Sequence, residues 1–422
     1  MTQPQRFCAA PLPPPVEFGM SRPVSPPAPA PADSLRPSTE SAGPLRAVLL
    51  MAGSCLPVLG AVLLAPVLPK MQEHFATVPG VKTLVPVVLT IPALALALLA
   101  PFAGVIVDRL GRVRLLVAAT LVYALLGTAP LWLDSLGAIV ISRVLVGIAE
   151  AAIMTCCTTL IGDYYSGRTR ERYLALQTMC ASISATAFFV IGGALGSAGW
   201  RAPFWIYAVG LLLAPAMALT LSGPRPAGTV EAEEPAGEKR PFPVRLLAGI
   251  CALTVFGAMV FYTVPVEMSY LLDDLGVKST GVIGLATAVA SAATVVGSIA
   301  FTRLSGSPDR RLPLVFALCA AGFVVIALAN SPVIVIVGAV LNCLGTGMLL
   351  PSLLTIAMSR LSYADRGRGT GLWTAAFFAG EFICPLVLIG LESATGSMAH
   401  AVGILGLASA LVAGGLLLGR RR

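Results

Sequence analysis

The sequence GVIVDRLGRVR occupies residues 104–114, between two long runs of apolar residues. Four of these residues are charged, and no other charged residue lies between Lys82 and Asp134. Glycines at 104 and 111 permit a sharp turn and a close approach of two helices. A basic, glycine-bearing turn between apolar runs of this length is unusual, and it indicates two helices that each cross a membrane.

The whole chain has the composition of a membrane protein. Of its 422 residues, 57% are apolar and 11% are charged, and the mean hydropathy is +0.88. Soluble domains carry about 25% charged residues, so a soluble chain this apolar could not cover its own surface. Lipid is therefore the expected solvent for most of the chain.

Apolar runs of about 20 residues alternate with short polar breaks from Arg46 onward, and each is long enough to cross about 30 Å of hydrocarbon as a helix. Helices rather than strands are expected, because the backbone must satisfy its own hydrogen bonds in lipid. The sequence therefore predicts an all-α membrane protein with twelve transmembrane helices. Their expected ranges are 46–69, 81–106, 113–133, 136–163, 173–196, 200–221, 244–271, 280–302, 311–329, 332–359, 369–391 and 398–419.

Two segments of different composition divide the chain. Residues 1–45 contain 12 prolines and little apolar periodicity. They predict a disordered cytoplasmic tail, with a proline-rich arm that binds a partner as the alternative. Residues 222–243 are rich in Pro, Glu, Lys and Arg, and they predict a cytoplasmic linker between six-helix halves at 46–221 and 244–422. The segment RLSGSPDRR at 303–311 partly repeats the charged turn of the first half, which indicates an internal repeat.

Lysine and arginine residues are distributed unevenly between the two sides of the predicted helices. Of the 28, four fall on one side, 23 fall on the other, and Arg143 lies within a helix. The four are Lys70, Lys82, Arg201 and Lys278. Because cytoplasmic loops carry the excess of basic residues, both termini are expected in the cytoplasm. The net charge of +8 then faces anionic membrane lipid, and no nucleic-acid partner is expected.

Residues 104–114 closely resemble the signature loop between helices 2 and 3 of the major facilitator superfamily of secondary transporters. That loop reads roughly Gly-x-x-x-Asp-Arg-x-Gly-Arg-x-Arg, and every fixed position is filled in this chain. The resemblance implies a latch that holds the cytoplasmic ends of helices 2, 3 and 11 together when the transporter faces outward. The implied latch residues are Gly104, Asp108, Arg109, Gly111, Arg112 and Arg114, and the implied docking side before helix 11 is Asp365, Arg366 and Arg368. The alternative is that the arginines are only topology signals.

Arg143 and Glu150 are charged residues inside the fourth predicted helix, where an unpaired charge is costly and a functional role is expected. They are seven residues apart, so they share one helix face about 10 Å apart along the axis. The sequence RVLVGIAEAA at 143–152 resembles the superfamily's helix-4 motif, whose arginine lies in the core and is implicated in proton transfer. An arginine near a carboxylate can make its occupancy by a proton or a cationic substrate switchable. The alternative is a structural pair that holds helix 4 against helix 1.

Two further carboxylates lie within predicted helices. Glu381, in the sequence GEFICP at 380–385, is expected to face a central cavity, with a hydrogen bond to a neighbouring helix as the alternative. Glu267 lies near the outer end of helix 7, where it is either functional or snorkels to the outer surface. Uncharged candidates for lining a cavity, each also consistent with helix packing, are Gln177, Asn342, Tyr123, Tyr262, Trp373 and Phe377.

Other classes of site lack their signatures in this sequence. The two histidines are His74 and His400, and eight of the nine cysteines fall in apolar runs, so no metal or haem site is expected. A Walker loop for an ATP-driven pump and a nucleophile–base constellation for an enzyme are both absent from the sequence. No cofactor is therefore expected, and a proton gradient is the expected energy source.

The resemblance thus implies an alternating-access transporter of a bacterial inner membrane, most similar to bacterial drug or metabolite efflux permeases. It is expected to exchange its substrate for protons through Glu150, Arg143 and Glu381. A symporter or facilitator that imports a small organic solute stays open as the second possibility. It stays open because Phe188 and Phe189 stand where the antiporters' helix-5 motif has a Gly-Pro pair. A receptor or scaffold is disfavoured, because it would not need a latch. The expected partner is a small-molecule substrate, and the expected state is a monomer.

Overall fold

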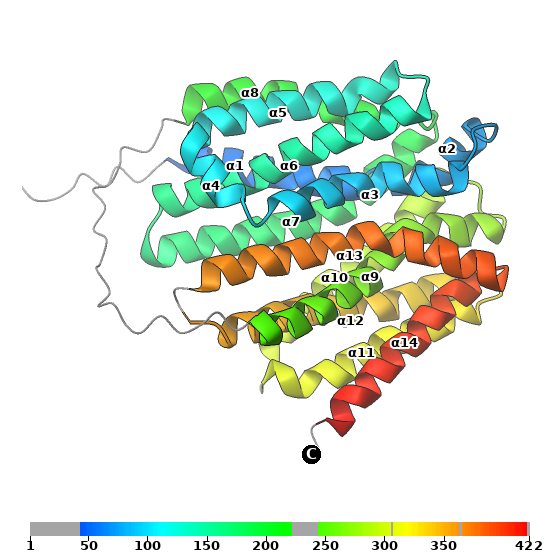
Figure 1. Ribbon diagram of the computed structural model, residues 1–422. Coiled ribbons are helices and arrows are strands. Elements are labelled where there is room, and N and C mark those ends of the chain that lie inside the picture. Colours follow the sequence, from blue (N-terminus) through cyan, green and yellow to red (C-terminus); the bar gives the residue numbers. More distant parts are fainter. Residues whose placement is uncertain (1–42, 222–243, 305–306, 363–364, 420–422) are drawn as a thin grey trace, which may run out of the picture. The chain divides into compact units, whose positions relative to one another are not determined.

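The computed structural model describes residues 43–221, 244–304, 307–362 and 365–419. Within them every regular element is a helix (Figure 1), and twelve spans are long and apolar enough to cross a membrane. The prediction of an all-α membrane protein with twelve spans is therefore confirmed. Most of the predicted tail, the whole linker and the middle of the 303–311 repeat lie outside the described residues, and the domain boundaries stay predictions.

The first six spans contain several interrupted helices. Their elements are α1 (Pro44–Val62), η1 (Ala65–Val67), α2 (Leu68–His74), α3 (Val81–Leu99), α4 (Ala103–Leu110), α5 (Arg112–Thr128), η2 (Ala129–Leu131), α6 (Leu136–Tyr164), α7 (Gly167–Gly196), η3 (Ala202–Ala208) and α8 (Val209–Thr220).

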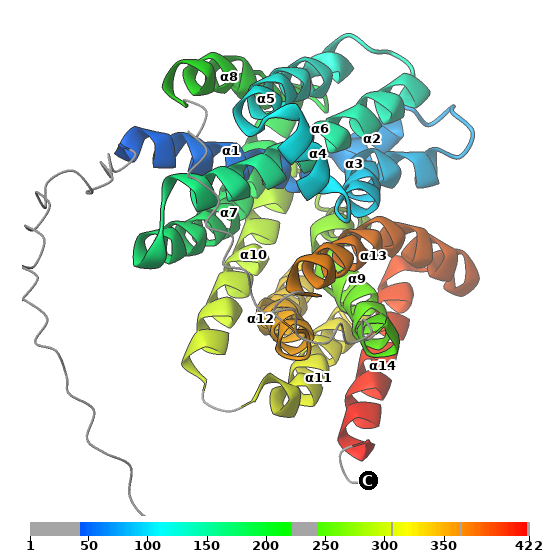
Figure 2. The same ribbon diagram turned by 60° about the vertical axis from the view of Figure 1, so that its left-hand side comes forward.

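The last six spans are single helices. They are α9 (Val244–Asp274), α10 (Thr280–Arg303), α11 (Pro308–Ala327), α12 (Pro332–Ser359), α13 (Arg366–Thr395) and α14 (Met398–Leu418). These helices pack on one another, and the helices from α1 to α8 form a second packed group (Figures 1 and 2). The two groups meet where α3 packs on α13 and α7 packs on α10.

The first predicted helix is broken within its span. Pro66 and Pro69 lack a backbone N–H group, so α1 ends at Val62 and the span continues as η1 and α2. The expected turn at 104–114 is mostly helical, because α4 extends to Leu110. The turn itself is confined to Gly111, which has a φ of 83°. Glycine adopts this conformation without strain because it has no Cβ atom.

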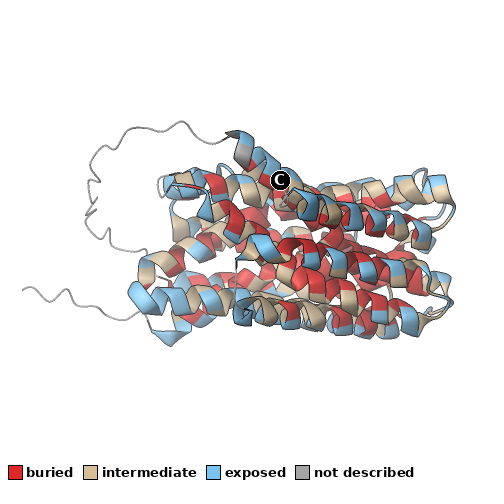
Figure 3. Ribbon diagram, turned by 90° about the horizontal axis from the view of Figure 1, so that it is seen from below, coloured by how far each residue is buried: buried red, intermediate tan, exposed pale blue. Residues whose placement is uncertain are grey.

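The outer faces of the helices carry large apolar side chains. Leu98, Trp205, Leu212 and Leu219 are among those that are exposed, and Figure 3 shows buried positions mainly between the helices. A continuous surface of this kind would aggregate in water. Contact with lipid accounts for it, because each helix satisfies its own backbone.

Candidate functional site

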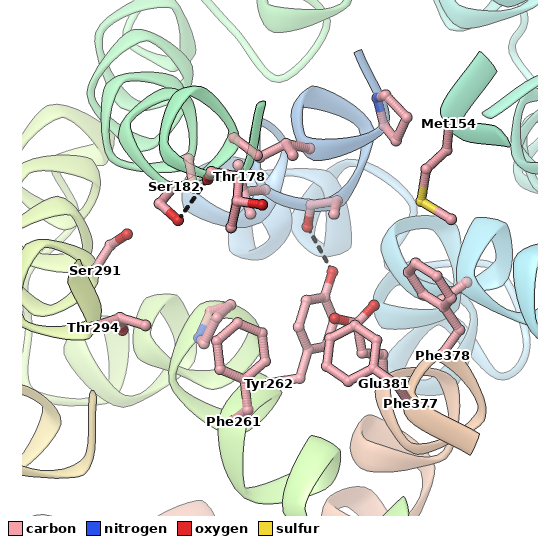
Figure 4. A pocket seen from close by; sticks show the side chains of 18 of the residues that line it. Met154, Thr178, Ser182, Phe261, Tyr262, Ser291, Thr294, Phe377, Phe378 and Glu381 are labelled. Carbon is pink, nitrogen blue, oxygen red and sulfur yellow. Dashed lines mark hydrogen bonds between the residues drawn. The ribbon is translucent and has the colours of Figure 1, made fainter. Parts of the chain in front are cut away.

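A cavity of about 720 Å³ lies between the two groups of helices (Figure 4). Helices α1, α3, α6 and α7 form one wall, and α9, α10, α12 and α13 form the other. Most of the lining side chains are apolar or aromatic, and its acidic members are Glu150 and Glu381. A cavity of this size and character suits a small organic molecule.

The cavity is closed at one end. There the last turns of α7 meet the first turns of α10, and a Cβ atom added to Gly193 would lie 2.6 Å from the carbonyl oxygen of Thr280. The buried residues of α7 all lie near this end, at Phe189, Gly192, Gly193 and Gly196. The rest of α7 has no buried residue, and its Leu174 lines the cavity near the other end. The cavity therefore opens toward the end that carries residues 104–114.

Helix α1 ends in the middle of the first span, beside the cavity. Carbonyl groups in the last turn of a helix lack donors within that helix. Side chains from other helices donate hydrogen bonds to two of these carbonyl groups in α1. Nη2 of Arg143, on α6, donates to the carbonyl oxygen of Gly60 at 3.2 Å. The hydroxyl of Tyr262, on α9, donates to the carbonyl oxygen of Ala61 at 2.6 Å, the dashed line at Tyr262 in Figure 4. Residues of both helix groups therefore converge on the break in α1.

Arg143 and Glu150 both reach α1 beside Gly60. Arg143 is fully buried and also donates to the hydroxyl of Tyr207 at 2.7 Å. The buried Glu150 carboxylate lies against the α-carbon of Gly60, where a Cβ atom would collide with it. Within the described residues, Nε and Nη1 of Arg143 and Oε1 of Glu150 have no hydrogen-bond partner. The two side chains share a face of α6, but the direct structural pair considered as the alternative is not formed.

Glu381 reaches the same cavity from the other helix group. It is 5% exposed and lies on α13, which packs so closely on α9 that a Cβ atom at Gly380 would lie 2.6 Å from that of Ala258. Its carboxyl group is an electrostatic neighbour of Glu150. The structure thus brings Glu150 and Glu381 to one cavity, with Arg143 behind the wall, and the roles of these residues stay predictions.

Glu267 lies apart from the other predicted carboxylates. It is 1% exposed, so the alternative that it snorkels to the outer surface is wrong for this conformation. It does not line the cavity, and neither carboxylate oxygen has a hydrogen-bond partner in the part of the chain that the structure describes. Its electrostatic neighbour is Glu392 of α13. Any role for Glu267 would therefore be separate from the cavity.

The uncharged candidates divide into two sets. Gln177, Tyr262 and Phe377 line the cavity, and Gln177 donates to the hydroxyl of Ser54 at 2.8 Å. The other set does not line the cavity. Tyr123 donates to the carbonyl oxygen of Leu56, and Asn342 donates to that of Cys319. Trp373 stacks on Phe377 of the same helix.

Hydroxyl side chains of α10 line the wall and were not predicted. Thr287, Ser291 and Thr294 follow one another along this helix, and Thr186 of α7 forms a hydrogen bond with Ser291 at 3.1 Å. Figure 4 shows Ser291 and Thr294 on the side of the cavity away from Phe377. The signal was their i, i+4, i+7 spacing in an apolar helix, which places them on one face.

The predicted latch is tied to the end of α6 in this conformation. Arg112 pairs with Asp108 at 2.7 Å and also with Asp163. Asp163 was not predicted, although it is the acidic residue of the segment GDYYSGRTR at 162–170, where α6 ends and α7 begins, and so offers a partner to a basic loop. Arg109 and Arg114 make no hydrogen bond or ion pair with any other described residue.

The predicted docking side lies at the start of α13, whose first turn contains Arg366 and Arg368. Asp365 accepts a hydrogen bond from the hydroxyl of Ser362 at 2.7 Å, and it pairs with no arginine of residues 104–114 within the described chain. The backbones are close nevertheless, since a Cβ atom added to Gly371 would lie 3.4 Å from the α-carbon of Pro101. The docking of Asp365 on the loop is therefore not seen in this conformation.

Twelve apolar spans in two packed groups, with a cavity between the groups that opens at one end, are the architecture of a membrane transporter. The sequence model of the Major Facilitator Superfamily matches residues 50–385 and, in a second alignment, residues 250–422. The chain belongs to this family, whose members are transporters rather than enzymes.

Two proteins from Escherichia coli are similar to this chain in sequence. Tetracycline resistance protein, class C, is 31% identical over 205 residues, which are 47% of this chain and 48% of that protein. The chain therefore spans about half the length of this relative. Inner membrane transport protein RhmT of strain K12 is 25% identical over 348 residues, which are 75% of this chain and 80% of that protein.

Solved structures show the same fold at low sequence identity. A D-xylose-proton symporter has a TM-score of 0.76 at 14% identity, over 88% of this chain and 96% of that chain. A bacterial homologue of the human lysosomal transporter Spinster, in an inward-facing and occupied conformation, has a TM-score of 0.68 at 17% identity, over 89% of this chain and 96% of that chain.

Proposed function

We propose that this protein is a secondary active transporter that exports a small organic drug or metabolite in exchange for protons. The observation that carries the proposal is that Glu150 and Glu381, from opposite helix groups, line one cavity that is open at one end. Ionisable residues inside a transporter's membrane core are the usual carriers of protons. Arg143, held behind Glu150, completes the proposed proton path. The similarity to a tetracycline resistance protein also supports export.

We infer a bacterial inner membrane from the resemblance to bacterial efflux permeases. The distribution of Lys and Arg supports an orientation with both termini in the cytoplasm. In this orientation the cavity opens to the cytoplasm, and the pairing of Arg112 with Asp163 belongs to the inward-facing state. The transporter works as a monomer surrounded by lipid, and the proton gradient is its energy source.

The second candidate function is proton-coupled import of a small organic solute. It is favoured by Phe188 and Phe189, which replace the Gly-Pro pair of the antiporter motif. The fold likeness to a D-xylose-proton symporter is compatible with it.

Whole-cell measurements separate export from import. Cells that overexpress the chain are compared with a knockout strain on a panel of toxic organic compounds, and accumulation of each compound is measured. Export predicts higher tolerance to at least one compound, together with lower accumulation that rises when the proton gradient is collapsed. Unchanged tolerance to every compound, with faster growth on one solute as carbon source, would overturn export in favour of import.

A further inference from the structure

The residues on the wall of the cavity that can carry a full charge at neutral pH are all acidic. Glu150 and Glu381 are its carboxylates, and none of the side chains that line it belongs to lysine, arginine or histidine. The remaining polar groups are hydroxyls, the amide of Gln177 and the thiol of Cys343. A cavity with acceptors and no cation of its own on the wall disfavours an anionic ligand, because like charges in a low-dielectric interior repel strongly.

The nearby arginine balances one of these two carboxylates. Arg143 is fully buried behind the wall, where the carbonyl of Gly60 and the hydroxyl of Tyr207 hold it on the side of Glu150. Glu381 comes from the other helix group, and its electrostatic neighbour is Glu150, another acid. When both carboxylates are ionised, the core therefore keeps one negative charge that the described side chains around it do not neutralise.

Aromatic rings surround the Glu381 side of the cavity. The rings of Phe377 and Phe378 are T-shaped with centroids 5.2 Å apart, and Phe261 lies 6.0 Å from Phe377. Figure 4 shows these rings beside Glu381 and Tyr262. Ring faces attract organic cations, and more strongly where water is excluded. The rings also offer a large apolar surface to the body of such a ligand.

We propose that the cavity binds lipophilic organic cations that carry aromatic groups, with the cationic centre at Glu381 and its rings among Phe261, Phe377 and Phe378. This assignment rests on the proposed transport function and narrows its substrate class. The volume of about 720 Å³ admits a drug-sized cation. A proton and the cation then compete for the same carboxylate, so that binding of one weakens binding of the other. Sugars and organic acids lack the charge that this site needs.

Two ions of nearly equal shape and opposite charge test the proposal. Tetraphenylphosphonium and tetraphenylborate are titrated into the full-length protein in nanodiscs, with empty nanodiscs as the blank, and binding is measured by calorimetry. The proposal predicts that the phosphonium binds at least about tenfold more tightly than the borate, a difference of about 1.4 kcal/mol. Lowering the pH should weaken phosphonium binding. Equal affinities, or tighter binding of the borate, would overturn the proposal.

Variants locate the charge that is responsible. Glu381→Gln should lose about tenfold in affinity for the phosphonium, and Glu381→Asp should retain most of it. Glu392→Gln is the matched control, because Glu392 lies on the same helix and does not line the cavity. Equal losses in Glu381→Gln and Glu392→Gln, at unchanged melting temperatures, would contradict the assignment. If Glu381→Gln does not fold, Phe377→Leu serves as a second test. It should also weaken phosphonium binding, because it removes one of the rings that contact the ligand.

The binding result is independent of the direction of transport. Tight phosphonium binding without proton-driven export would leave this inference standing and would count against the proposed function. Proton-driven export of a compound by a protein that does not bind the phosphonium would leave the proposed function standing and overturn the substrate class.

Discussion

The hydroxyl of Tyr262 donates a hydrogen bond of 2.6 Å to the carbonyl oxygen of Ala61. This bond joins α9 of the second helix group to the broken end of α1 in the first. Arg143 occupies the preceding carbonyl, that of Gly60. The contact between the two helix groups, at Ala61, and the proposed proton site, at Gly60, are therefore adjacent in the chain. We therefore expect that the rocking of the two groups in alternating access breaks the bond from Tyr262.

Tyr262→Phe should loosen the closed end of the cavity. The change keeps the ring and leaves the Ala61 carbonyl without its donor, which costs about 1 kcal/mol. Hydrogen exchange followed by mass spectrometry should show several-fold faster exchange in peptides that cover residues 61–68 and 279–285. Tyr123→Phe is the control, because Tyr123 donates to the carbonyl of Leu56 at 2.8 Å within one helix group. Faster exchange at the closed end in the control alone would refute the role given to Tyr262.

Gly60→Ala should destabilise the protein specifically through Glu150. The new Cβ atom would collide with the Glu150 carboxylate, so the melting temperature should fall. In a Glu150→Ala background the same change should be nearly neutral, which gives an interaction free energy on the order of 1 kcal/mol or more in a double-mutant cycle. Additive effects of the two substitutions would mean that the carboxylate does not lie against α1.

Asp163→Asn should impair gating with little loss of stability. The ion pair of Arg112 with Asp163 is partly exposed, and such pairs contribute about 0.2–1 kcal/mol. Transport in cells should fall several-fold at equal protein level in the membrane. Asp134→Asn is the matched control, since it breaks an exposed pair with Arg201 at the opposite end of the helices. The role of Asp163 fails if both variants transport as the wild type does.

The orientation can be checked on exposed positions at opposite ends of the helices. In whole cells, Lys278→Cys should react with a maleimide that does not cross the membrane, and Arg360→Cys should react only after the cells are opened. The wild-type chain gives the background from its own cysteines. Labelling of Arg360→Cys in intact cells would reverse the orientation.

Much of the fold could be predicted from hydropathy, because lipid forces each apolar run to be a helix that satisfies its own backbone. The twelve spans follow from the lengths of the apolar runs. The position of Arg143 and Glu150 on one face of α6 follows from their spacing of seven residues. The break after Val62 was missed, although Pro66 marks it. The residues on both sides of Pro66 are apolar, so hydropathy shows one continuous run. The break in the helix is possible because side chains of other helices donate to the carbonyl groups at its end.

The contents of the cavity depend on the rotation of each helix, which a single sequence does not fix. Glu267 and Glu381 are both acidic residues inside apolar helices, yet only Glu381 lines the cavity. Tyr262 and Tyr123 both donate to carbonyls of α1, but only Tyr262 does so across the two helix groups. Asp163 pairs with Arg112 because the ends of α5 and α6 lie side by side, and the sequence alone does not reveal this arrangement.

Proton exchange through Glu150 is tested most directly by flux in proteoliposomes, using the compound that the toxicity panel identifies. With an imposed pH gradient, wild-type protein should move the compound against its concentration gradient. Glu150→Gln should abolish this uphill movement and retain measurable exchange of labelled for unlabelled compound without a gradient, which shows that the protein is folded and alternates. Undiminished gradient-driven flux in Glu150→Gln would contradict the account.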